Sequence, residues 1–416
     1  MPSKRKLWLI LIGLGLAGLL IAAYQGWQYA SRAETRLYAL DAETGRVQWS
    51  TSLGTHNWVS QPVVSDGRVF VDTIPEKSHA RALAAFDAAT GRPVWTYTPD
   101  PTQPVRQIPS PSAAPLANAG VVIDDLSEET FGLFEAATGA LRQSFTPASL
   151  PAHCQPAALA ANRLAVLVRQ DDYTHLSLQV FDLQTSALLW QTAIEADIYT
   201  DQQPLVIGAG RVFVNNRHQV DAFDLESGQL QFSLAVTPHQ LQRGDTQIYV
   251  TDYRQLSAFE TATGALRWTF SPPPDPPTDF SHLLDGLQAD GQTVYISNLN
   301  RESRQAWLFA LDAADGRERW RQLLADYSSG LLDPSTAFFT LQPAVAAQTV
   351  FVINDLQDAP ALTALAAADG KELWRFPLYT WTGRSPATDG TRVFLVDRAP
   401  RWRNWLAHLN PAWHED

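Results

Sequence analysis

The chain has 416 residues, of which 45% are hydrophobic, so it is long enough to bury a large core. Its formal net charge of -12 at pH 7 repels phosphate backbones and argues against nucleic acid as a partner. The single cysteine, Cys154, excludes an internal disulfide framework and a cysteine-based metal site, and we expect its thiol to be buried and inert.

The N-terminus carries a signal for membrane insertion. Three basic residues at positions 4–6 precede an apolar run over residues 7–23, and aromatic residues flank both ends of that run. A positive flank and an aromatic belt are typical of a transmembrane helix whose N-terminus stays in the cytoplasm. The run is also compatible with the core of a signal peptide, for which residues 31–33 would be a weak cleavage site. The predicted order is a cytoplasmic segment at residues 1–6, a transmembrane signal-anchor helix at 7–27 and a linker at 28–35.

One unit then recurs eight times. Its cleanest copy occupies residues 37–49 and places Asp41, Gly45 and Trp49 at fixed spacing. Between the copies lies a second signature, which is a short apolar run, a turn and an alternating run, as in residues 61–71. A repeat of this length suits four short strands with their loops. The matching residues of the later copies are Asp87, Gly91, Trp95, Trp190, Gly264, Trp268, Asp312, Gly316, Trp320, Gly370 and Trp374.

The residue types of the unit predict its structure. Alternating residues such as those at 68–71 favour strands with one buried face. The Asp and Thr side chains can bond nearby backbone in a tight turn, and Gly adopts a positive φ without steric cost. The Trp is too large for a narrow strand pair, so we expect it to cover the gap between neighbouring sheets. The repeat therefore predicts an all-β fold of sheets arranged radially.

These residues resemble the pyrroloquinoline-quinone (PQQ) propeller family, whose hallmark is the tryptophan-docking motif Ala-x-Asp-x-x-Thr-Gly-x-x-x-Trp. Residues 39–49 and 85–95 match the motif throughout. Other copies are eroded: Gln143 and Phe232 replace Trp, Ser186 replaces Gly, and Ala366 replaces Asp. The resemblance implies an eight-bladed β-propeller with four-stranded blades.

The two ends of the repeat region predict how the ring closes. The first docking motif lacks a strand pair before it, and the last strand pair, residues 385–397, lacks a docking motif after it. We therefore expect N- and C-terminal segments to share the closing blade, with residues 405–409 as a candidate extra strand. How the strands divide between the two ends stays open. The predicted propeller spans residues 36–410, and residues 411–416 form a tail.

The connections between strands predict a functional face. If strands A to D run outward from the axis, the short A–B and C–D turns share one face. The longer B–C and D–A connections lie opposite, and we expect function there because variable loops on a rigid scaffold carry binding sites. The long connections include residues 97–111, 272–285, 298–305 and 325–342. Four aromatic residues precede the innermost strands: Trp58, Tyr199, Phe339 and Trp381. They form a candidate interaction rim at the channel mouth, or they only pack the loops onto the blades.

The sequence offers little support for catalysis. Quinone enzymes of the resembled family pair adjacent cysteines over the quinone, use an aspartate base and hold Ca²⁺. This chain has one cysteine, and we expect its acidic doublets, residues 124–125 and 171–172, to lie in solvated B–C loops. We therefore predict no catalytic residue, no cofactor and no metal.

The closest resemblance in style is to the non-enzymatic propeller of the outer-membrane barrel-assembly machinery, which is tethered by a lipid rather than by a helix. This resemblance implies a membrane-anchored, extracytoplasmic scaffold that binds protein partners on the face of the long connections. It also implies that the propeller is monomeric and that the protein acts in envelope assembly. Two alternatives stay open: a quinone-dependent oxidoreductase or its degenerate relative, and a ligand-binding sensor that uses the central channel.

Overall fold

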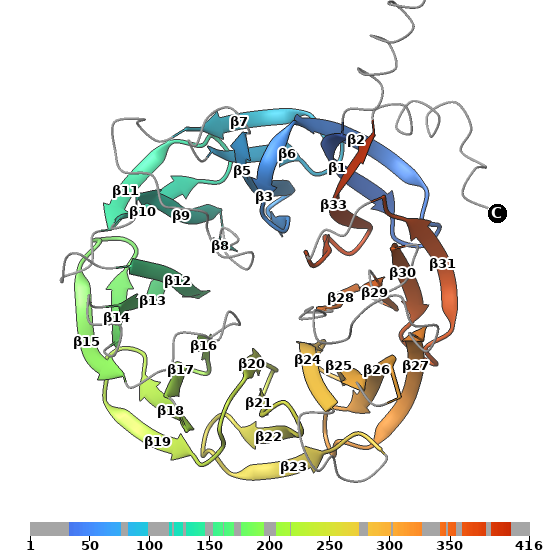
Figure 1. The fold of residues 1–416 in the computed structure, drawn as a ribbon. Coiled ribbons are helices and arrows are strands. Elements are labelled where there is room, and N and C mark those ends of the chain that lie inside the picture. The colour runs from blue at the N-terminus through green and yellow to red at the C-terminus, as the bar shows by residue number, and fades with distance from the viewer. Residues whose placement is uncertain are drawn as a thin grey trace, which may run out of the picture.

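Eight antiparallel sheets surround a central axis in the computed structural model, and each sheet is one blade of a β-propeller (Figure 1). The fold therefore agrees with the blade number and the all-β class predicted from the repeat. The structure describes residues 33–75, 82–98, 116–118, 120–127, 130–145, 153–160, 162–169, 176–194, 205–216, 218–273, 282–300, 303–326, 342–346, 348–354, 360–379 and 384–400.

Seven blades are built from consecutive strands, whose order in each sheet follows the order in the chain from the axis outward (Figure 1). In the first of them the innermost position is shared by two short strands, β3 and β4, which both pair with β5. The strands of the first four blades are β3 (His56–Val59), β4 (Val63–Ser65), β5 (Arg68–Pro75), β6 (Ala82–Asp87) and β7 (Pro93–Tyr97); β8 (Leu116–Asn118), β9 (Val121–Ser127), β10 (Thr130–Glu135) and β11 (Leu141–Phe145); β12 (His153–Ala160), β13 (Arg163–Arg169), β14 (Leu176–Asp182) and β15 (Leu188–Ile194); and β16 (Leu205–Gly208), β17 (Arg211–Asn216), β18 (Gln219–Asp224) and β19 (Leu230–Leu234). The next three blades comprise β20 (Gln240–Arg243), β21 (Gln247–Thr251), β22 (Leu256–Glu260) and β23 (Leu266–Phe270); β24 (His282–Ala289), β25 (Thr293–Asn300), β26 (Gln305–Asp312) and β27 (Glu318–Asp326); and β28 (Ala344–Ala346), β29 (Thr349–Asn354), β30 (Ala361–Ala366) and β31 (Glu372–Pro377).

The eighth blade closes the ring with strands from both parts of the chain. Its order is β2-β1-β33-β32, in which β1 (Ala33–Asp41) and β2 (Val47–Gly54) come from the N-terminal side. The inner strands, β32 (Ala387–Thr388) and β33 (Arg392–Pro400), come from the C-terminal side. The strands β1 and β33 pair along their whole length and lie side by side as blue and red arrows in Figure 1. The closing blade is thus shared as predicted, and the division that the sequence left open is two plus two.

The turn between the third and fourth strands forms as its residue types predict. In the first copy, Asp41 Oδ1 accepts hydrogen bonds from the Thr44 amide at 2.9 Å and from the Thr44 hydroxyl at 2.8 Å. The Gly45 amide donates to the Asp41 carbonyl at 2.9 Å, and Gly45 has a φ of 68°. The hydrogen bond from the Thr44 hydroxyl, together with hydrogen bonds from backbone amides, holds the pKa of Asp41 below its usual value.

The core lies between neighbouring blades. Leu37 of β1, Val69 of β5 and Phe394 of β33 are fully buried in one apolar cluster that joins the closing blade to the next. The corresponding clusters along the ring likewise combine residues from two adjacent sheets, because each sheet has two apolar faces and both are covered. Burial of each such side chain contributes roughly 1.5–3 kcal/mol, so the ring is stabilised mainly at its junctions.

Several predicted boundaries differ from the structure or lie outside its described part. The strand β1 begins at Ala33, so the last residues of the predicted linker belong to the propeller. Strands also extend into predicted loops; β24, for example, begins at His282. Within the described residues no helix is long and apolar enough to cross a membrane, and the predicted helix at residues 7–27 lies outside them. Residues 401–416, with the candidate strand and tail, also lie outside the described part.

Candidate functional site

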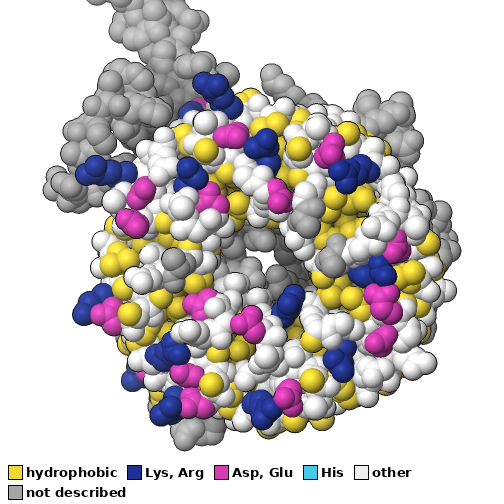
Figure 2. Space-filling model, turned by 180° about the vertical axis from the view of Figure 1, so that it is seen from behind, with side chains coloured by type: hydrophobic (Ala, Val, Ile, Leu, Met, Phe, Trp, Pro, Cys, Tyr) yellow, Lys and Arg dark blue, Asp and Glu magenta, His cyan; other side chains and the backbone are white. Residues whose placement is uncertain are grey.

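The two faces of the ring differ in their connections. On one face, the A–B and C–D turns of each blade lie together, as in the first complete blade, where the Ala88 amide donates to the Gly67 carbonyl at 3.0 Å. The same bond recurs in every blade. Figure 2 shows this face, where basic and acidic side chains are interspersed around a central opening. The B–C and D–A connections therefore lie on the opposite face, which we call the long-loop face.

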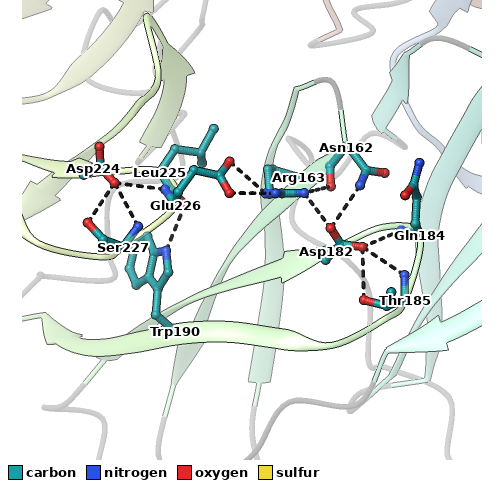
Figure 3. Close-up of polar contacts among 10 residues, drawn as sticks. All are labelled: Asn162, Arg163, Asp182, Gln184, Thr185, Trp190, Asp224, Leu225, Glu226 and Ser227. Carbon is teal, nitrogen blue, oxygen red and sulfur yellow. Dashed lines mark hydrogen bonds and ion pairs between the residues drawn. The ribbon is translucent and has the colours of Figure 1, made fainter.

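Charged side chains of the short-turn face are engaged within the protein. Arg163 at the start of β13 lies between two blades (Figure 3). It bonds Asp182 of its own blade at 2.6 Å and Glu226 of the next blade through two nitrogens, at 3.1 and 2.6 Å. Bidentate contacts of this kind are the strong ones among charged hydrogen bonds. Arg163 therefore joins two blades through its ion pair with Glu226, whereas other ion pairs of this face, such as Arg319 with Asp312, lie within one blade.

The motif tryptophans dock each blade onto the next. The Trp49 indole lies against Gly91 of the following blade, and its Nε1 donates to the Ala88 carbonyl at 3.0 Å. A β-carbon on Gly91 would lie 2.3 Å from Trp49 Cε3, so only glycine leaves room for the ring. Five further indoles donate in the same way to a backbone carbonyl of the next blade. The acceptor is in each case the residue three positions before the motif glycine: Trp95 donates to Ala136, Trp190 to Leu225, Trp268 to Ala313, Trp320 to Ala367, and Trp374 to Ala42.

The turn carboxylates and glycines of the remaining motif copies occupy equivalent places. They lie at C–D turns, where the carboxylate accepts backbone or hydroxyl hydrogen bonds and the glycine has a positive φ, as seen at Asp87, Asp312, Gly264, Gly316 and Gly370. These residues form the ring junctions and are not gathered into a single pocket.

One eroded junction is compensated by a paired substitution. Gln143 takes the place of the indole, and its Nε2 donates to the Gln184 carbonyl at 3.0 Å. The Ser186 hydroxyl, where other blades have glycine, donates to Gln143 Oε1 at 2.6 Å. Ser186 keeps the left-handed backbone, with a φ of 57°. The serine side chain fits because glutamine is narrower than indole, so the two departures from the motif depend on each other.

On the long-loop face, the structure describes one of the four predicted rim residues. Trp58 lies in β3, at the inner edge of its blade, and is 9% exposed. Within the described part of the chain its Nε1 has no hydrogen-bond partner. The Arg384 guanidinium lies over its ring, with Cζ 5.9 Å from the centroid. Tyr199, Phe339 and Trp381 lie outside the described residues. Sequence patterns did not single out Arg384, which precedes the short strand β32.

A second group on the long-loop face was not predicted. His239, just before β20, stacks on Tyr253, with ring centroids 3.7 Å apart. Tyr253 has a φ of 72°, unusual for a residue with a side chain, and its carbonyl accepts the Leu284 amide at 2.7 Å. Asp285 Oδ1 lies 3.9 Å from His239 Nε2. The group joins two neighbouring blades, and single scattered histidines in the sequence gave no signal for it.

The buried imidazole of His239 predicts acid sensitivity. Burial lowers its pKa from 6.5 to about 4, and this desolvation outweighs the nearby Asp285 carboxylate. A lowered histidine pKa means that stability is complete above pH 6.5 and is lost as the pH falls towards 4. From pH 6.5 to pH 5 we expect a loss of about 2 kcal/mol. Urea unfolding at pH 7, 6 and 5 measures it, and a His239→Gln variant should lack the slope above pH 5; an equal slope in both proteins would contradict the assignment.

The described residues contain no group of three or more His, Cys, Asp or Glu that could hold a metal ion. One acidic doublet was placed wrongly from sequence. Asp124 and Asp125 lie within β9, opposite Gly132 and Phe131 of β10, because backbone pairing continues beyond the apolar part of the strand. The doublet at residues 171–172 and the side chain of Cys154 lie outside what the structure describes.

Comparisons with known proteins agree with this architecture. The family model described as "Outer membrane protein assembly factor BamB" matches residues 3–151, 237–323 and 304–405. A search of curated proteins finds no significant match.

Solved structures share the fold at low sequence identity. Quinohemoprotein alcohol dehydrogenase ADHIIG from Pseudomonas putida HK5 is 13% identical, with 88% of this chain and 75% of that chain covered and a TM-score of 0.54. AztD from Citrobacter koseri is 10% identical, with 88% and 98% covered and a TM-score of 0.54. BamB from Moraxella catarrhalis is 14% identical, with 86% and 91% covered and a TM-score of 0.49. The likenesses to the dehydrogenase and to AztD speak for the fold. The family model matches more than half of the residues, and the chain belongs to the PQQ-repeat family of the outer membrane protein assembly factor BamB.

Proposed function

We propose that the protein is a membrane-anchored, extracytoplasmic scaffold that binds a protein partner through its long-loop face. Membership of the BamB family supports a role in protein–protein interaction. The predicted helix at residues 7–27 would tether the ring. Since only residues 28–32 separate that helix from β1, the propeller would stay close to the membrane surface.

The observation that carries the proposal is the contrast between the two faces. On the short-turn face, charges such as those of Arg163 and Glu226 bond to each other across blades. On the long-loop face, the buried indole N–H of Trp58 has no hydrogen-bond partner among the described residues. Tryptophan and arginine are enriched among residues that dominate binding energy at interfaces. In the proposal, Tyr199, Phe339 and Trp381 complete the rim around Trp58.

Crosslinking in membranes followed by affinity purification tests the scaffold function. We expect the wild-type protein to capture a specific partner and the Trp58→Ala/Trp381→Ala variant to capture at least tenfold less, because truncating interface anchors costs 2 kcal/mol or more, which is roughly 30-fold in affinity. Val94→Ala, at a 39% exposed side chain on the outermost strand β7, is the matched control and should capture partner normally. Identical partner sets in all three proteins would exclude the rim as the binding surface.

The enzymatic alternative has its own measurement. Purified protein incubated with pyrroloquinoline quinone and Ca²⁺ is scanned for quinone absorbance and for alcohol-dependent dye reduction. Dye reduction that requires both the quinone and Ca²⁺ would show that the protein is an oxidoreductase and would contradict the scaffold function.

A further inference from the structure

The described chain enters and leaves the ring on its long-loop face. Strand β1 runs towards the short turns, where the amide of Ala42, just after its end, donates to the Thr391 carbonyl at 3.0 Å. Its first residue, Ala33, therefore lies at the opposite face, where it pairs with Pro400, the last residue of β33. Figure 1 shows these two strands side by side in the closing blade. The part of the chain before residue 33 is thus attached to the long-loop face.

The length of chain before β1 limits how the ring can lie on a membrane. The predicted helix at residues 7–27, which is outside the described residues, leaves only residues 28–32 as a linker. A linker of this length spans at most about 18 Å when fully extended. The 9 residues of β1 span about 30 Å between the two faces. A linker that starts at the long-loop face therefore cannot reach around the ring, and the short-turn face cannot lie on the bilayer.

The charges of the short-turn face suit contact with water. Ion pairs recur there around the ring, for example between Arg68 and Asp87 at 3.1 Å and between Lys371 and Asp369 at 2.7 Å. The Lys371 side chain is 81% exposed. Figure 2 shows basic and acidic side chains distributed over this whole face. Transfer of hydrated charges from water into a lipid layer is costly, so charge and linker length favour the same orientation.

The rim residue Trp58 lies beside the blade that carries the linker. Its ring is 5.9 Å from Cζ of Arg384, which precedes β32 of the closing blade. The strand β3, which contains Trp58, neighbours that blade at the top of Figure 1. The gap between this part of the long-loop face and the bilayer is therefore set by the linker. A folded domain of about 100 residues is about 30 Å across and is too large for a gap of about 18 Å.

We propose that the short linker turns the long-loop face towards the bilayer and that the partner bound there is the extracytoplasmic part of an integral membrane protein. The proposal deepens the scaffold function and rests on it for the anchor and for the binding face. A loop of a membrane-embedded protein already lies at the bilayer surface and fits the gap beside Trp58. Because one membrane would hold both proteins, the concentration of each at the other would rise without any additional contact.

Energy transfer from the full chain to lipids in vesicles tests the orientation. In a Cys154→Ala background, His218→Cys or Gln229→Cys carries a donor fluorophore, and lipid headgroups of both leaflets carry the acceptor. Both residues are exposed, His218 on the long-loop face and Gln229 at a short turn of the same blade, across the ring from the closing blade in Figure 1. The 6 residues of β18 separate them by about 20 Å. We expect transfer to be at least twofold more efficient from position 218 than from position 229.

A chain with a longer linker is the matched control. About 30 Gly and Ser residues inserted between residues 32 and 33 have a mean end-to-end distance of about 30 Å, which lets the ring turn over. We expect the difference between the two positions to fall at least by half. Equal transfer from both positions in the original chain, stronger transfer from position 229, or a difference that survives the insertion would overturn the proposal. Chains that do not float with the vesicles would instead contradict the anchor, and with it the proposed function.

Extraction with alkaline carbonate tests the class of the partner and needs no variant of the chain. The partner identified by crosslinking is followed in membranes that have not been crosslinked. We expect it to stay in the membrane pellet, as an integral membrane protein does. Release of the partner into the supernatant would contradict a membrane-embedded partner and leave the scaffold function intact. Failure to capture any specific partner would contradict the scaffold function itself.

Discussion

Replacing Trp374 with alanine is expected to lower the free energy of unfolding by about 3 kcal/mol, since truncating a large aromatic side chain costs 3–5 kcal/mol and this indole is partly exposed. Trp374 docks the β28–β31 blade onto the closing blade. It lies against Gly45, and its Nε1 donates to the Ala42 carbonyl at 3.2 Å. This contact joins residues 332 positions apart in the chain, so its loss weakens the junction that closes the ring.

Urea unfolding followed by circular dichroism measures the effect. The matched control is Leu373→Ala, because Leu373 is the preceding residue of β31 and is 50% exposed. We expect the control to change stability by less than about 0.5 kcal/mol. A loss below 1 kcal/mol in Trp374→Ala would show that the indole covers the junction without stabilising it.

Replacing Gly91 with alanine is expected to cost about 3 kcal/mol, for two reasons that a control can separate. Gly91 has a φ of 67°, a backbone conformation that costs an L-residue roughly 1–2 kcal/mol. The new β-carbon would also lie 2.3 Å from Trp49 Cε3 and would displace the indole from its place. Gly67 has nearly the same φ, 70°, but no atom of the described residues lies within 4 Å of the place that a β-carbon would take there. Gly67→Ala should therefore cost only about 1–2 kcal/mol.

A double-mutant cycle then tests whether indole and glycine depend on each other. The natural pair Gln143 and Ser186 is imitated by Trp49→Gln with Gly91→Ser. We expect Gly91→Ser to cost at least 1 kcal/mol less in the presence of Trp49→Gln, because the amide leaves room for the serine side chain. Equal losses for Gly91→Ala and Gly67→Ala, or an additive cycle, would show that the indole does not require the glycine.

The repeat made much of the fold predictable. Asp41, Thr44 and Gly45 specify a turn by their own chemistry, and alternating residues specify strands, so each unit could be recognised from a few adjacent positions. Eight copies and an incomplete unit at each end then predicted the ring and its shared closing blade. The same register placed Trp58 just before an innermost strand, whereas in the structure Trp58 itself lies in the inner strand β3.

Other features could not be predicted because they depend on contacts between distant residues. In the sequence, Gln143 and Ser186 are two unrelated departures from the docking motif. In the folded ring they form a hydrogen bond with each other across a blade junction. Likewise, the doublet containing Asp124 looks like a loop by polarity, but pairing with β10 keeps it in a strand.

The sequence by itself determined the blade count, the turn chemistry and the interblade role of the tryptophans, because these follow from local patterns repeated at regular intervals. Only the tertiary structure decided the two-plus-two closing blade, the stacking of His239 on Tyr253, and the meeting of Trp58 with Arg384. The physical reason is that ring closure brings together segments from opposite ends of the chain, and their mutual positions are set by the packing of all eight blades at once.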